Sequence, residues 1–172
     1  RIDVLERVGV DELGQPTWRL VEVKSSTKVK ATHVDDLTIQ SYVLEGLGLA
    51  LVDICLMHVN TQYVFDGRHL DLEQLFGVRS LTETVRPRLS EVPARLAAMQ
   101  TMLEAMSAPG ITPDEHCQSP YECPFWNHCI ENKPARWIYH LPGSSKTVVQ
   151  LRELGIETID EIPDHVALTL VQ

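Results

Sequence analysis

The chain has 172 residues, of which 44% are hydrophobic, and its formal net charge is −9 at pH 7. This length and apolar content suffice for one ordinary hydrophobic core, so we expect one domain with an appendage. The sequence has no signal-peptide pattern and no run of about 18 or more apolar residues, which predicts a cytoplasmic protein without a membrane partner. The negative charge argues against a broad basic surface for nucleic acid, because phosphate binding draws on Lys and Arg.

Two strand-like stretches begin the chain, at residues 1–7 and 18–25. Both are rich in apolar and β-branched residues, and the segment between them contains the turn formers Asp11, Gly14 and Pro16. The pattern predicts a β-hairpin with a loose loop.

A helix and a buried strand are predicted next. Thr32 has the properties of a helix N-cap, and Asp35 follows in the capping-box position. The apolar run at residues 49–60 predicts a buried strand, and residues 62–65 predict one more short strand before a turn. The order strand, strand, helix, strand predicts an α/β fold.

The second half of the chain has helical patterns. Apolar residues recur every three or four positions from residue 81 to about 108, which predicts a long amphipathic helix that Pro87 or Pro93 kinks or delays. We expect its Met residues to fill the core. Residues 146–163 predict two short helices around Gly155.

The hairpin also carries candidate metal ligands. Glu22 and Lys24 are two residues apart in a strand, so their side chains share one face of the sheet. Asp3 can reach this face from the partner strand. The two carboxylates, with the Val23 carbonyl, would form an oxygen-rich site for Mg²⁺ or Mn²⁺, with Lys24 near the activated water. The ordinary alternative is a surface hairpin with a cross-strand ion pair.

An Asp followed by Glu-x-Lys on the next strand resembles the PD-(D/E)xK nuclease superfamily, and within it the RecB-like branch. The following helix is similar to one that carries a Gln and a Tyr in RecB-like enzymes, and Gln40 matches this pattern better than Tyr42 does. The resemblance implies a restriction-endonuclease-like core, in which a mixed central sheet is flanked by helices, and catalytic roles for Asp3, Glu22, Lys24 and Gln40. It implies a metal-dependent DNA nuclease, expected to be an exonuclease, that acts on single strands or duplex ends. The alternative is a non-catalytic module that keeps the fold and binds nucleic acid or protein.

Three cysteines follow the long helix at C-x5-C-x5-C spacing: Cys117, Cys123 and Cys129. Such regular spacing in an intracellular chain favours metal over disulfides. The arrangement is similar to the cysteine cluster of iron–sulfur RecB-like nucleases, including CRISPR-associated RecB-like exonucleases and AddB-type nucleases. That resemblance implies a 4Fe-4S cluster, with a fourth Cys upstream of Arg1. Zn²⁺ held by three Cys and His116 or His128 is the alternative.

The resemblance further implies that a part of the nuclease core precedes Arg1, in a longer protein with further domains. We predict a RecB-like core at residues 1–80, a helix and cysteine segment at 81–133, and a helix-hairpin-helix-like element or linker at 134–172. The last two form a helical, cysteine-containing extension of the core. Cys55 is expected to be a core hydrophobe, and His33 and His58 are expected to be hydrogen-bonding core or edge residues.

Overall fold

The hairpin predicted at the start of the chain is present in the computed structural model, which describes residues 1–118, 121–142 and 145–169. Strands β1 (Val4–Val10) and β2 (Pro16–Lys24) pair antiparallel around a turn. In this turn the Asp11 carboxylate accepts hydrogen bonds from the backbone of Leu13 and Gln15, and Gly14 has a positive φ. These are the turn residues that the sequence indicated.

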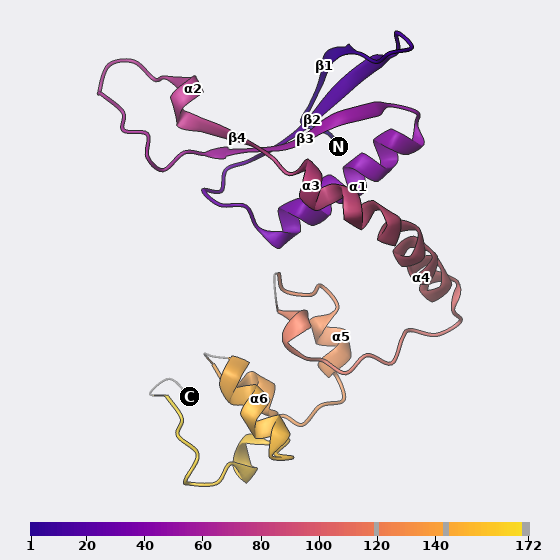
Figure 1. Ribbon diagram of the computed structural model, residues 1–172. Helices are drawn as coiled ribbons and strands as arrows, with labels where there is room; N and C mark the ends of the chain where they lie inside the picture. Colours follow the sequence, from indigo (N-terminus) through magenta and orange to yellow (C-terminus); the bar gives the residue numbers. More distant parts are fainter. Residues whose placement is uncertain (119–120, 143–144, 170–172) are drawn as a thin grey trace. The chain divides into compact units, whose positions relative to one another are not determined.

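A crossover helix joins the hairpin to the rest of the sheet. Helix α1 (Ala31–Gly46) leads to strand β3 (Ala50–Val59), which pairs parallel with β2. Strand β4 (Phe76–Ser80) pairs antiparallel with β3, so the sheet has the order β1-β2-β3-β4 and is mixed. The predicted α/β class with a mixed sheet flanked by helices is thereby confirmed (Figure 1).

The main core lies where α1 packs on the sheet. Alternation along β2 turns Leu20 towards α1, where it meets Leu37 and Leu44, and Ile54 and Leu56 of β3 join them. Burial of these side chains fixes the register of the strands, because a shift by one residue would expose all of them. The further buried members of this cluster are Val34, Leu51, Leu81 and Val85.

Two local predictions are wrong, and two elements were not predicted. The N-cap of α1 is Lys30, not Thr32, because the His33 ring accepts a hydrogen bond from the Lys30 backbone amide at 3.2 Å. Residues 62–65 form no strand, since the Asn60 side chain accepts a hydrogen bond from the Gln62 amide and starts a turn. A one-turn helix, α2 (Leu72–Leu75), and the edge strand β4 lie in a segment where no element was predicted.

The long helix predicted from residue 81 is divided into α3 (Thr82–Val85), the 3-10 helix η1 (Arg86–Glu91) and α4 (Val92–Glu104). Pro87 and Pro93 each occupy the first turn of a new segment, where a missing amide hydrogen costs least. The Met residues do not fill the core as expected, because Met99, Met102 and Met106 are exposed.

The chain divides into two compact units, Arg1–Met106 and Ser107–Gln172. The division predicted at residues 80 and 133 stays a prediction. The second unit has its own small core of Trp137, Ile138, Leu141, Val148 and Leu151. Its elements are η2 (Glu115–Cys117), α5 (Trp126–Ile130), η3 (Ile138–His140), α6 (Ser145–Glu153) and η4 (Ile159–Glu161).

Gly155 has a positive φ and separates α6 from η4, as the sequence indicated for two short helices at 146–163. Across the described ranges, none of the helices has both the length and the apolar character needed to cross a membrane.

Candidate metal and nuclease site

The Glu-x-Lys pair lies at the end of β2, on the sheet face that α1 covers. Glu22 follows Leu20 at a spacing of two, so both side chains turn towards α1, and Glu22 is buried with 6% of its surface exposed. The Lys24 ammonium is 2.7 Å from Glu22 Oε1. The pairing partner of a buried carboxylate is thus supplied from the same strand.

Helix α1 holds both members of this pair. Gln40 Nε2 donates a hydrogen bond to Glu22 Oε2 at 2.8 Å, and Lys24 Nζ donates one to Asp36 Oδ2 at 2.8 Å. Asp36 and Gln40 are four residues apart, so they share one face of the helix. Asp36 was not among the predicted site residues, although its spacing from Gln40 was a signal in the sequence.

Lys24 carries a lasting positive charge in this setting. The hydrogen bond to Asp36, followed by the one to Glu22, raises the pKa of Lys24 well above its usual range, against the opposing effect of burial. The side chain is therefore an ammonium at neutral pH. It can stabilise negative charge but is not available as a proton acceptor.

Asp3 lies at the same end of the hairpin. Its Oδ2 accepts a hydrogen bond from the Val23 amide at 3.0 Å, and its side chain is exposed. The β1–β2 register pairs Val4 with Val21, and its continuation by one residue places Asp3 opposite Glu22. In an extended strand the amide and carbonyl of one residue point to the same side, so the Val23 carbonyl also points towards Asp3.

These oxygen atoms are compatible with a hard divalent cation. Gln40 Oε1 is buried beside Glu22 and has no hydrogen-bond partner among the described residues, so an acceptor there is left uncompensated. Among all the residues that the structure describes, no group of three or more His, Cys, Asp or Glu side chains is placed to hold a metal ion. Mg²⁺ does not require such a cage, since one or two carboxylates with water and substrate phosphates are its usual ligands.

His33 and His58 form hydrogen bonds, as expected. His33 is buried, and burial, followed by the charges of Lys24 and Lys30, lowers the pKa of His33. Its Nδ1 accepts the Lys30 amide hydrogen, so a neutral ring carries its proton on Nε2. His58 Nδ1 lies 3.1 Å from the Val59 carbonyl.

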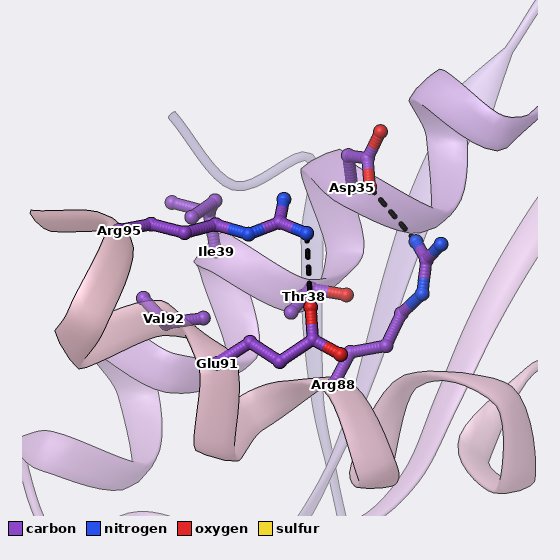
Figure 2. A pocket seen from close by; sticks show the side chains of 7 residues that line it. All are labelled: Asp35, Thr38, Ile39, Arg88, Glu91, Val92 and Arg95. Atoms are coloured by element: carbon purple, nitrogen blue, oxygen red, sulfur yellow. Dashed lines mark hydrogen bonds and ion pairs between the residues drawn. The ribbon is translucent and has the colours of Figure 1, made fainter.

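Arginines that follow β4 bind the helices to one another. Arg88 pairs with Asp35 at 2.8 Å, and Arg95 pairs with Glu91 at 2.9 Å, on the walls of a pocket of about 40 Å³ between α1 and the η1–α4 segment (Figure 2). This pocket is too small for a substrate. Arg86 likewise pairs with Glu45, so these three side chains contribute little uncompensated charge for a nucleic-acid groove.

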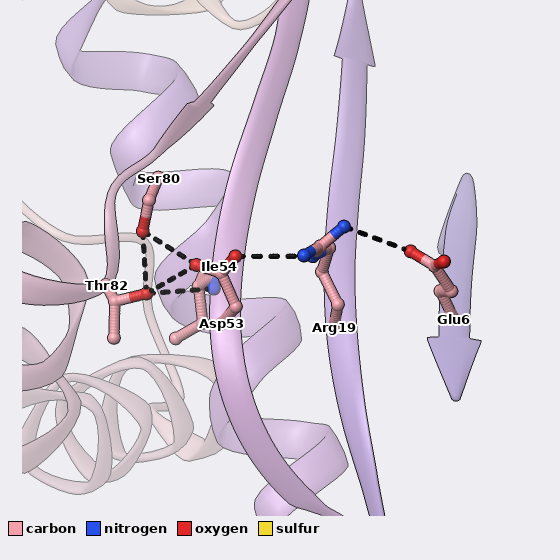
Figure 3. A network of polar contacts seen from close by, with 6 residues as sticks. All are labelled: Glu6, Arg19, Asp53, Ile54, Ser80 and Thr82. Carbon is pink, nitrogen blue, oxygen red and sulfur yellow. Dashed lines mark hydrogen bonds and ion pairs between the residues drawn. The ribbon is translucent and has the colours of Figure 1, made fainter. Parts of the chain in front are cut away.

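The opposite face of the sheet carries a polar network that crosses the strands. Arg19 lies between Glu6 and Asp53, 3.3 Å from each, and Ser80 and Thr82 donate hydrogen bonds to Asp53 Oδ1 at 2.7 and 3.1 Å (Figure 3). The network joins β1, β2 and β3 to the end of β4. The network lies on the sheet face opposite α1, so the sheet separates it from the Glu22 site.

Cys55 is buried on β3, and burial, with a hydrogen bond to Asp53, raises the pKa of the Cys55 thiol to about 12. It is the core residue that the sequence predicted. Cys117, Cys123 and Cys129 belong to the second unit, and each is a free thiol. The Cys123 amide donates to the Cys117 carbonyl at 2.7 Å, but the described residues include no three-ligand metal group there.

Comparisons with known proteins do not place the chain in a family. No family model, no curated protein and no solved structure matches it. The chemistry of the site therefore rests on its own geometry.

Proposed function

We propose that the protein is a Mg²⁺- or Mn²⁺-dependent nuclease of the PD-(D/E)xK, RecB-like type that hydrolyses phosphodiester bonds of DNA. One observation carries this proposal: Glu22 is buried and hydrogen-bonded to both Lys24 and Gln40, at the hairpin end where Asp3 lies. An ordinary surface ion pair would not need a helix to hold both of its members. Burying a carboxylate is costly unless it is paired and hydrogen-bonded, as Glu22 is by Lys24 and Gln40.

The residues have distinct roles in this proposal. Asp3, Glu22 and the Val23 carbonyl would hold the divalent ion, which supplies a nucleophilic water and neutralises phosphate charge when bound. Lys24, whose ammonium form is favoured by its two carboxylate partners, stabilises the charge that develops on the phosphate. Gln40 fixes the orientation of Glu22, and Asp36 does the same for Lys24.

The three cysteines of the second unit would hold a 4Fe-4S cluster, for which a further Cys would complete the ligand set. Three thiolates are the donors that such clusters prefer, and the regular spacing supports a common centre. Zn²⁺ with His116 or His128 is the alternative, since zinc accepts both ligand types. This part of the proposal is independent of the nuclease site.

The test is a cleavage assay of the full chain on end-labelled single- and double-stranded DNA, with Mg²⁺ or Mn²⁺ and with a chelator. We expect cleavage that requires the ion and is lost in Asp3→Asn. Asp35→Asn is the matched control, because Asp35 is exposed and pairs with Arg88 away from the site. Ion-dependent DNA binding without cleavage would contradict the proposal and favour a non-catalytic binding module.

A further inference from the structure

A second, larger pocket lies entirely within the unit Ser107–Gln172. It has a volume of about 210 Å³, and the described residues on its walls include Lys133, Trp137, Tyr139, Arg152 and Glu157. We propose that this pocket binds a nucleotide, with the base against the aromatic wall and the phosphate on the cationic side chains. The site extends the proposed function but does not depend on cleavage.

The aromatic wall is rigid. The rings of Trp137 and Tyr139 are stacked with centroids 4.3 Å apart, and Trp126 stacks on Trp137 at 6.0 Å. Trp137 is buried, whereas Tyr139 is partly exposed, and both residues line the pocket. An aromatic surface that is already ordered loses little conformational entropy when a base stacks against it, and every base offers a π face.

Two cations flank this wall. Lys133 Nζ lies 5.3 Å from the centroid of the Trp137 ring. Arg152 pairs with Asp114, which also accepts a hydrogen bond from the Tyr139 hydroxyl at 3.1 Å. A guanidinium group has five N–H donors, so one carboxylate orients Arg152 and leaves donors for a phosphate.

The hydroxyl and guanidinium keep defined charge states. Burial and the hydrogen bond to Asp114 raise the pKa of Tyr139, so its phenol stays neutral and continues to donate to Asp114. The Arg152 side chain is 48% exposed, which leaves its outer face open to a ligand. Two cations beside a stacking surface favour a phosphorylated aromatic ligand over a neutral sugar or an apolar molecule.

Glu157 provides a sharp internal test, because its exposed carboxylate lies on the same pocket and would repel a phosphate. Removal of this charge and removal of Arg152 should therefore change affinity in opposite directions. Arg136 offers a matched control, since it is an arginine of the same unit that pairs with an aspartate, Asp160, and does not line the pocket.

The experiment measures the fluorescence anisotropy of a labelled oligothymidylate of about 12 nucleotides. This length lies within the roughly 4–16 nucleotides that known single-strand-binding domains cover. The full chain is used with a chelator, so that no cleavage occurs. Tyr139→Ala should weaken binding about tenfold. Arg152→Ala should weaken binding and reduce the slope of log affinity against log salt concentration by about one. Glu157→Gln should strengthen binding, and Arg136→Ala should leave it unchanged. Equal effects of Arg152→Ala and Arg136→Ala would overturn the proposal.

A measurement on the unaltered protein guards against variants that fail to fold. In NMR titrations, the Trp137 indole and Arg152 side-chain signals should shift on addition of the oligonucleotide. Shifts with thymidine monophosphate as well would identify the nucleotide itself as the ligand, and shifts with the strand alone would identify a nucleotide within a strand. If neither probe moves these signals, the pocket is not a nucleotide site. Neither the anisotropy nor the NMR measurement contains a cleavage step, so a failed nuclease proposal remains distinguishable from a failed nucleotide site.

Discussion

Lys24 is the residue whose surroundings say most about its role. Two carboxylates, Glu22 and Asp36, lie within 2.8 Å of its ammonium nitrogen. The Glu-x-Lys spacing was evident in the sequence, and so was Gln40 as a candidate partner. The contact between Lys24 and Asp36 was not, because it depends on how α1 packs against β2 and not on local spacing.

Replacement of Lys24 by Ala should abolish cleavage while the fold is retained. The ammonium is held for its charge and contributes little to packing. Its removal leaves the buried Glu22 carboxylate with Gln40 as its partner, so the free energy of unfolding should fall by about 1–3 kcal/mol. The check is the cleavage rate together with the circular dichroism spectrum. Lys28→Ala is the control, since Lys28 is an exposed lysine of the loop after β2. Full activity in Lys24→Ala would mean that another group supplies the charge.

Asp53 should make stability depend on pH. Burial by itself would raise the pKa of Asp53, but hydrogen bonds from Ser80, Cys55 and Thr82 and the charge of Arg19 outweigh it and lower the pKa below 3.8. The stabilisation is therefore complete above the unfolded value and is lost as pH falls through the lower folded value. Asp53→Asn should reduce the free energy of unfolding at pH 6 by about 1 kcal/mol.

Urea unfolding of both proteins between about pH 6 and pH 3 measures this effect. The difference between the unaltered chain and Asp53→Asn should shrink as the carboxylate is protonated. A difference that stays constant or grows towards low pH would contradict the assigned network.

At the scale of elements, apolar periodicity predicted the helices and strands that have a regular buried pattern. The hairpin, α1 and β3 each have an apolar pattern that the sheet and helix bury, and their order followed from the sequence. β4 was missed because it is a five-residue edge strand with glycine at Gly77, and its pairing with β3 comes from tertiary structure. The prolines marked correctly where the helix after residue 81 is interrupted.

The packing of α1 can be tested by comparing a leucine on its buried face with the leucine at its C-cap. Leu37 is fully buried, whereas Leu47, the C-cap residue, is 72% exposed. Leu37→Ala should lower the free energy of unfolding by about 2–5 kcal/mol, because a core cavity remains. Leu47→Ala should change it by no more than about 0.5 kcal/mol. Similar losses in chemical denaturation would contradict the assigned face of the helix.

For the whole molecule, the division into two compact units was not evident from composition. The predicted division kept the helix from residue 81 and the cysteine segment together, whereas the structure separates the two units after Met106. Which residues each core buries depends on contacts distant in sequence, as for Trp137 and Leu151. The spacing of Cys117, Cys123 and Cys129 was visible in the sequence, and the convergence of their three thiols on one metal centre stays a prediction.

The connection between the units should be the first site of proteolysis. Residues 105–112 are exposed and lie outside helices and strands. Backbone with few protecting contacts opens locally at little cost and is preferred by proteases. Limited proteolysis followed by mass spectrometry should give two fragments that meet in this range. Initial cleavage within β2 or β3 would contradict the assigned units.

The central claim is that Asp3 and Glu22 hold a divalent ion for phosphodiester hydrolysis. Its most direct test is a crystal structure of the full chain with Mn²⁺, in which anomalous scattering locates the metal. We expect an ion bound by Asp3, Glu22 and the Val23 carbonyl, at distances near the roughly 2.0–2.1 Å of Mg²⁺ sites. If Glu22 stays bound to Lys24 and Gln40 at saturating Mn²⁺, with no metal between Glu22 and Asp3, the claim is contradicted.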